Sequence, residues 1–192
     1  MEDLVCKYRY RVISLALFFV LNTTTFAQTS IKGNVATALI GIPNFGFETN
    51  LGRKTTFQLD VTASFWTIKG VPYKFALLFP EFRYYTRRSG NGFFVGAHVG
   101  GGRYKLQKWN HDVSGDYQDG YSVFYGISLG YQFEISNRIN LELFIGGGNQ
   151  QGYYKAYSLK TGERTDGATD FNKSGEFLPY RGGLMLVYKL GR

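Results

Sequence analysis

The segment that decides the fold is YSVFYGISLGYQFE, residues 121–134, in which two kinds of side chain alternate strictly. One set is large and apolar: Tyr121, Val123, Tyr125, Ile127, Leu129, Tyr131 and Phe133. The other set is mostly small or polar: Ser122, Phe124, Gly126, Ser128, Gly130, Gln132 and Glu134. Successive side chains of a β-strand point to opposite faces of a sheet, so this two-residue period predicts a strand with one apolar face.

The same alternation recurs from residue 31 to the end of the chain, between short clusters of turn residues. It marks eight strand-like segments: residues 31–40, 44–51, 55–67, 75–86, 92–106, 121–134, 138–154 and 177–190. The composition suits strands, since it includes 17 Phe, 15 Tyr and only 4 Pro. We therefore predict an all-β protein, an eight-stranded antiparallel up-and-down transmembrane β-barrel, because an even number of strands lets such a sheet close.

The connections between the segments differ in length. Those at 52–54, 87–91 and 135–137 are short, and those at 68–74, 107–120 and 155–176 are longer and polar; only 41–43 breaks the order. Short turns at one end and long loops at the other are typical of outer-membrane barrels, whose loops face outward.

The small and polar set suits the inside of a narrow barrel, because eight strands leave room only for packed side chains. The apolar set carries aromatic residues near both strand ends, as at membrane interfaces. Toward the loops these are Trp66, Tyr73, Tyr121, Tyr153 and Tyr180; toward the turns they are Phe57, Tyr84, Phe93, Tyr131, Phe133 and Tyr188. The apolar set is thus expected to face lipid.

The N-terminus has the features of a secretory signal peptide. Three basic residues precede the apolar run 12–21, and Ala27 ends a small-residue cleavage site. A run of ten residues is too short for a membrane helix, which needs about 20. We predict a signal peptide over 1–27 and a barrel domain over 28–192. Removal of 1–27 also removes Cys6, the single cysteine, and with it disulfides and cysteine metal sites.

The formal charge of +8 falls to +7 without 1–27, because that segment holds three basic and two acidic residues. The remaining basic residues are scattered, which favours outer-membrane lipids and lipopolysaccharide as partners over nucleic acid. A monomer is expected.

Four stretches carry a resemblance to known barrels: IPNFGFE (42–48), PEFRYY (80–85), GFFVGAH (92–98) and YGISLGYQ (125–132). With them the chain resembles small outer-membrane barrels of the OmpA/OmpX type, and more closely a Bacteroidota family of unknown function. The resemblance implies eight strands, insertion by the barrel-assembly machinery and no known catalytic residues. One departure is the C-terminus, where the last aromatic residue, Tyr188, lies four residues before the end.

Seven ionisable residues fall on the polar faces and are expected in the lumen: Glu48, Asp60, Glu81, Arg83, His98, Glu142 and Arg181. An isolated buried charge is costly, so we expect ion pairs that plug the barrel. The alternative is a path for protons or ions along the lumen.

No pattern points to catalysis, a metal or a cofactor. Ser64, His98 and Glu81 could form a triad by type, but no nucleophile elbow is present. His111 and Asp112 fall in a polar loop, and the Gly triplets at 100–102 and 146–148 fit curvature or bulges better than phosphate loops.

We therefore expect a non-enzymatic outer-membrane barrel of a Gram-negative bacterium, with a structural or surface-interaction role. Two alternatives remain open: a membrane-embedded lipid-modifying enzyme, and a soluble periplasmic lipocalin-like binder with its apolar face inward.

Overall fold

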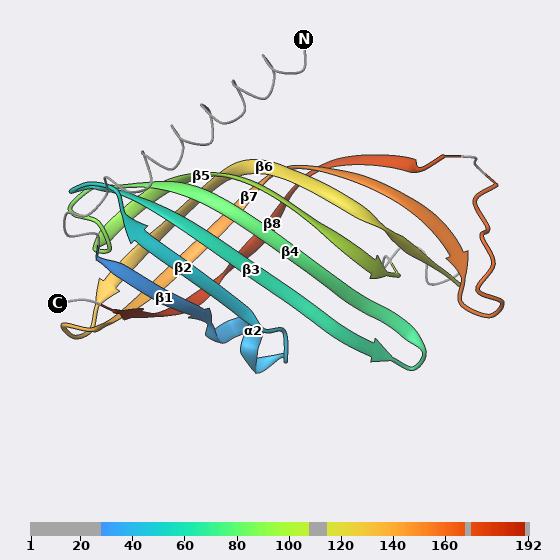
Figure 1. Ribbon diagram of the computed structural model, residues 1–192, viewed down its shortest axis with the longest axis horizontal. Coiled ribbons are helices and arrows are strands. Elements are labelled where there is room, and N and C mark those ends of the chain that lie inside the picture. The colour runs from blue at the N-terminus through green and yellow to red at the C-terminus, as the bar shows by residue number, and fades with distance from the viewer. Residues whose placement is uncertain (1–27, 108–114, 168–169, 191–192) are drawn as a thin grey trace, which may run out of the picture.

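The computed structural model describes residues 28–107, 115–167 and 170–190. Eight antiparallel strands pair in chain order, and β1 pairs with β8 to close a barrel (Figure 1). Their bounds are β1 Thr29–Asn34, β2 Asn44–Asn50, β3 Thr55–Ile68, β4 Val71–Tyr85, β5 Gly92–Leu106, β6 Asp116–Glu134, β7 Ile139–Ser158 and β8 Asn172–Lys189. The described part contains one helix, α2, at Val35–Leu39. The prediction of an all-β ring of eight up-and-down strands is confirmed.

The apolar faces of the strands point out of the ring and the polar faces point in. On β6, Ile127 is 59% exposed whereas Gln132 is 1% exposed. On β7, Leu143 is 57% exposed whereas Glu142 is fully buried. No helix in the described residues combines the length and the hydropathy that crossing a bilayer demands.

The first predicted strand, 31–40, is wrong over its second half, where the chain forms α2. The side chain of Asn34 caps this helix by accepting hydrogen bonds from the backbone N–H groups of Ala36 and Thr37. Asn at this position favours a helix start, and the alanines and leucine that follow are good helix formers. As a result β1 and β2 are the shortest strands of the ring.

Several strands extend further toward the loop side than predicted, so the long connections are shorter than predicted. The predicted loop 68–74 is wrong: β3 and β4 are joined by Lys69 and Gly70 alone, both with positive φ, at 50° and 84°. Two such residues form the tight turn that matches strand twist. β6 begins at Asp116, β7 ends at Ser158 and β8 begins at Asn172, so these strands likewise take residues from the predicted loops 107–120 and 155–176. The ends therefore differ less in loop length than expected.

A β-bulge changes the inward face of β8. Its pairing with β7 shifts between Gly146 and Gly147, which pair with Arg181 and Pro179 respectively. Tyr180 is therefore the extra residue, and it turns inward beside Arg181. Its hydroxyl lies 2.7 Å from His98 Nε2, so its predicted place on the outer loop-side girdle is wrong. Of the two glycine triplets for which curvature or bulges were predicted, the one at 146–148 lies at this register shift, whereas pairing runs through the one at 100–102 without a shift.

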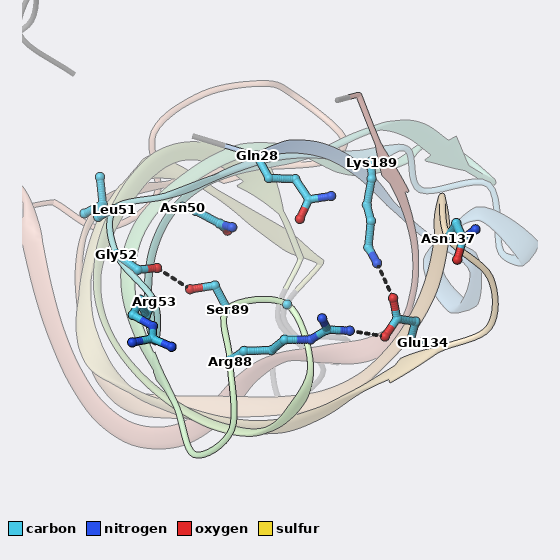
Figure 2. A pocket seen from close by; sticks show the side chains of 11 residues that line it. Gln28, Asn50, Leu51, Gly52, Arg53, Arg88, Ser89, Glu134, Asn137 and Lys189 are labelled. Carbon is cyan, nitrogen blue, oxygen red and sulfur yellow. Dashed lines mark hydrogen bonds and ion pairs between the residues drawn. The ribbon is translucent and has the colours of Figure 1, made fainter. Parts of the chain in front are cut away.

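Side chains fill the turn-side half of the ring. Tyr85, Phe94, Phe144, Met185 and Val187 form a buried apolar cluster there. The β4–β5 turn then crosses the mouth, where Ser89 Oγ donates to the Gly52 carbonyl oxygen at 2.7 Å (Figure 2). The predicted signal peptide, His111, Asp112 and the last two residues lie outside the described residues.

Candidate functional site: a buried chain of alternating charges

Seven charged side chains form a continuous chain across the interior, with alternating sign. They come from six strands and follow one another in the order Asp60, Arg181, Glu81, Arg83, Glu142, Lys32 and Glu48. Six of them point inward because successive residues of a strand face opposite sides of the sheet, and Arg181 points inward next to the bulge of β8. The chain therefore ties β1, β2, β3, β4, β7 and β8 together.

Arg83 is the central link. Its Nε lies 2.9 Å from Glu81 Oε1, and its Nη1 lies 2.9 Å and 3.0 Å from the two carboxylate oxygens of Glu142. The guanidinium also sits 4.3 Å from the centre of the Phe94 ring. Arg83 is fully buried, so these charge-assisted hydrogen bonds and this cation–π contact replace water around it.

Lys32 links Glu142 to Glu48 at the turn-side end of the chain. This lysine was not among the predicted lumen residues. Its Nζ lies 2.5 Å from Glu48 Oε2 and 2.5 Å from Glu142 Oε2, with the side chain fully buried. Two signals could have revealed it. Lys32 alternates with the apolar Ile31, and four lumen carboxylates against two arginines leave an excess of negative charge.

Arg181 forms the loop-side end. Its Nη1 lies 2.8 Å from Glu81 Oε2 and its Nη2 lies 3.9 Å from Asp60 Oδ1. Asn44 Nδ2 donates to both oxygens of Asp60, at 3.1 Å and 3.0 Å. The guanidinium packs on aromatic faces, 4.8 Å from the centre of Phe79 and 5.4 Å from that of Phe144.

Neutral side chains complete the hydrogen bonding of the carboxylates. Thr56 Oγ1 donates to Glu48 Oε1 at 2.5 Å, Ser128 Oγ donates to Glu81 Oε1, and the Tyr85 hydroxyl lies 3.0 Å from Glu48 Oε1. A buried ionic group that keeps its partners is tolerable, whereas one that loses a partner is strongly destabilising. The arrangement can therefore lock the strands together.

The structure brings six of the seven predicted lumen residues into this chain and places His98 next to it. His98 is 4% exposed and is bonded to Tyr180, not to a carboxylate. Ser64 donates to the Tyr73 carbonyl oxygen instead of to His98. The described residues include no group of three or more potential His, Cys, Asp or Glu metal ligands.

A second charged cluster lines a water-open hollow of about 510 Å³ at the turn-side mouth. Figure 2 shows Arg88 and Lys189 reaching Glu134 from opposite sides of that mouth. Arg88 Nη2 lies 2.5 Å from Glu134 Oε2, and Lys189 Nζ lies 3.0 Å from Glu134 Oε1. The Arg88 side chain is 65% exposed, so water screens this pair and it stabilises little.

Comparison with known proteins yields one family. The family described as "Protein of unknown function (DUF3575)" matches residues 12–190 of the 192. No curated protein and no solved structure matches the chain.

Proposed function

Because the chain belongs to DUF3575, a family of unknown function, its role rests on its own residues, and we propose a sealed β-barrel of the outer membrane of a Gram-negative bacterium. In this proposal the barrel has a structural or surface-interaction role in the envelope and no catalytic one. Residues 1–27 are its cleaved signal peptide.

The observation that carries the proposal is the inverted distribution of polarity. Apolar side chains cover the outside of the ring, and a chain of seven charges lies inside it. Soluble monomers rarely expose apolar patches larger than a few hundred Å². In a bilayer the same surface meets acyl chains, and a closed ring satisfies the backbone groups that lipid cannot.

The loop-side end supports a surface-interaction role. A membrane strand needs about 9–11 residues, whereas β6 has 19 and β7 has 20, so this hairpin extends beyond the bilayer. Its extension carries the stacked pairs Tyr117–Tyr157 and Tyr121–Tyr153, with ring centres 5.6 Å and 5.0 Å apart. Lysines accompany these rings, and Lys105 Nζ lies 4.6 Å from the centre of Tyr117. We call Tyr117, Tyr121, Tyr153, Tyr157, Phe171, Lys105, Lys155 and Lys173 the loop-side patch.

Cations beside aromatic rings suit the phosphates and sugars of lipopolysaccharide, which we propose as the partner of the loop-side patch. Insertion by the barrel-assembly machinery and a monomeric state complete the proposal. Tyr188 on β8 is then the aromatic residue that the machinery reads.

Membrane insertion is tested by expressing the full chain and fractionating the envelope. We expect extraction by detergent but not by high salt, a mature N-terminus at Gln28, and a mobility shift between unboiled and boiled gel samples. Release by salt alone would contradict insertion and favour the lipocalin-like binder. Loss of lipopolysaccharide acyl chains that His98→Ala abolishes would instead establish a lipid-modifying enzyme.

The sealed interior is tested in a planar bilayer. We expect no steady conductance, because the charge chain, the apolar cluster and the β4–β5 turn obstruct the ring in series. Large stable channels would contradict the sealed barrel and favour an ion path.

A further inference from the structure

The wall of the ring is incomplete on its loop side. β8 begins at Asn172, but its pairing with β1 starts only at Met185, opposite Asn34. β3 runs to Ile68, but its pairing with β2 ends at Thr62, opposite Asn44. In Figure 1, α2 lies at the end of the short β1–β2 hairpin while β3 and β8 continue past it. The loop-side parts of β3 and β8 therefore lack a neighbouring strand between them.

A cavity of about 470 Å³ lies in this gap. It is bounded by Thr62 on the β3 edge, by Gly182 and Gly183 on the β8 edge, and by Thr37 of α2. This volume is within the range of sites for small organic ligands. The cavity thus joins the lateral opening to the ring interior.

The inner wall of the cavity is largely apolar. Phe75, Leu77 and Phe79 of β4 face it, together with Phe144 and Pro179. These residues are on the inward side of β4, where charges occupy the turn-side half. An alkyl chain that moves here from the apolar bilayer would make dispersion contacts with these side chains and would stay in an apolar environment.

The far end of the cavity carries polar atoms that lack hydrogen-bond partners. The Arg181 side chain is 94% buried, since 6% of it is exposed, and its Nε and Nη2 make no hydrogen bond. Asn44 Oδ1, an acceptor, also has no hydrogen-bond partner. Leaving a buried donor or acceptor unsatisfied is unfavourable, so these atoms mark a place for a group that both accepts and donates.

Charge decides the class of ligand. Asp60 and Arg181 are the two charged residues that line the cavity, and their charges cancel. The whole buried chain contains four carboxylates and three cations, a sum of −1, so an anion would enter an interior that already repels it. A cation would meet Arg181. A neutral head group is the one that the site accommodates at least cost.

We propose that this cavity binds a neutral single-chain amphiphile that enters sideways from the bilayer. Its alkyl tail lies along Phe75, Leu77 and Phe79, and a hydroxyl-bearing head accepts from Arg181 and donates to Asn44. This inference rests on the proposed function, because lateral entry requires the barrel to be in a membrane.

The test is photolabelling of the full chain in phosphatidylcholine nanodiscs. The probe is a monoacylglycerol with a diazirine on its acyl chain, and adducts are mapped by mass spectrometry. We expect saturable labelling of the peptide that contains Phe75 to Phe79. Unlabelled monomyristoylglycerol should compete, whereas myristate and myristyltrimethylammonium should compete about tenfold less, or more weakly still.

A matched pair of variants locates the site. Leu77→Trp fills the cavity and should abolish the saturable labelling, whereas Leu78→Trp, its outward neighbour, should leave it unchanged. Equal competition by the charged amphiphiles, labelling that never saturates in the wild-type chain, or equal effects of the two variants would each overturn the inference.

The gel-shift and fractionation results separate the two proposals. An inserted barrel without saturable labelling would refute the cavity site alone. Saturable labelling of a chain that salt releases from the envelope would refute membrane insertion and lateral entry but leave the cavity as a binding site.

Discussion

Arg83 is the residue on which the interior depends most, because it joins two carboxylates that have no access to water. Its guanidinium contacts Glu81 and Glu142, and all three side chains are fully buried. Replacement by methionine keeps much of the volume and removes the charge. We expect Arg83→Met to lower the free energy of unfolding by about 3–5 kcal/mol, since breaking a buried pair leaves uncompensated charge.

The measurement is equilibrium unfolding by urea in lipid vesicles, followed by the heat-shift gel. Arg103→Met is the control, because the Arg103 side chain is 85% exposed and lies 3.9 Å from Asp119. It should change stability by less than about 1 kcal/mol. Similar losses in the two variants would show that the buried chain has no special weight.

At the scale of the element, the Gly triplet of β5 shows how close the inner packing is. A Cβ at Gly100 would overlap the Phe79 ring and lie 3.0 Å from the Leu78 carbonyl oxygen. Phe79 cannot easily retreat, because it packs against Phe124 and Tyr180. We expect Gly100→Ala to destabilise the barrel by about 1–3 kcal/mol through overpacking.

The neighbouring glycine provides the control for this substitution. A Cβ at Gly101 would meet its nearest heavy atom, the Ser122 carbonyl oxygen, at 3.6 Å, which is ordinary contact. Gly101→Ala should therefore stay within about 0.5 kcal/mol of the wild type in the same urea titration. A larger loss for Gly101→Ala than for Gly100→Ala would contradict the packing described.

The elements were predictable where alternation is regular and not where local hydrogen bonding competes with it. The eight strands and the polar inward faces followed from the two-residue period, whereas the bulge was indicated by the glycine triplet at 146–148. The helix α2 did not, because its start depends on the cap made by Asn34. The inward turn of Tyr180 did not either, because one extra residue in β8 reverses the expected face.

The candidate site was predictable in membership but not in connectivity. Six lumen residues were identified from their inward positions in the two-residue period. Which of them pair with one another depends on how the strands are aligned when β1 closes the ring against β8. Lys32 was missed because β1 is so short that its alternation covers few residues. The Arg181 atoms without a hydrogen-bond partner lie beside the gap in the wall. No local sequence pattern predicts that gap.

At the scale of the whole molecule, the two ends of the barrel carry similar numbers of basic residues in different settings. Lys105, Lys155 and Lys173 accompany aromatic rings in the loop-side patch. Arg53, Lys54 and Arg87 lie in the exposed β2–β3 and β4–β5 connections at the turn-side end. If the loop-side patch binds lipopolysaccharide, removing three positive charges there must weaken that binding more than removing three at the turns.

We expect the triple variant K105Q/K155Q/K173Q to weaken the binding of fluorescent lipopolysaccharide about tenfold or more at low salt, since each basic residue near an anionic surface contributes about 1 kcal/mol. The control R53Q/K54Q/R87Q changes the net charge equally and should weaken binding less than about threefold. Fluorescence anisotropy of the full chain in detergent at two salt concentrations measures both. Because the net charge is matched, equal weakening would mean that charge alone governs binding, and no weakening of either would refute phosphate recognition by the loop-side patch.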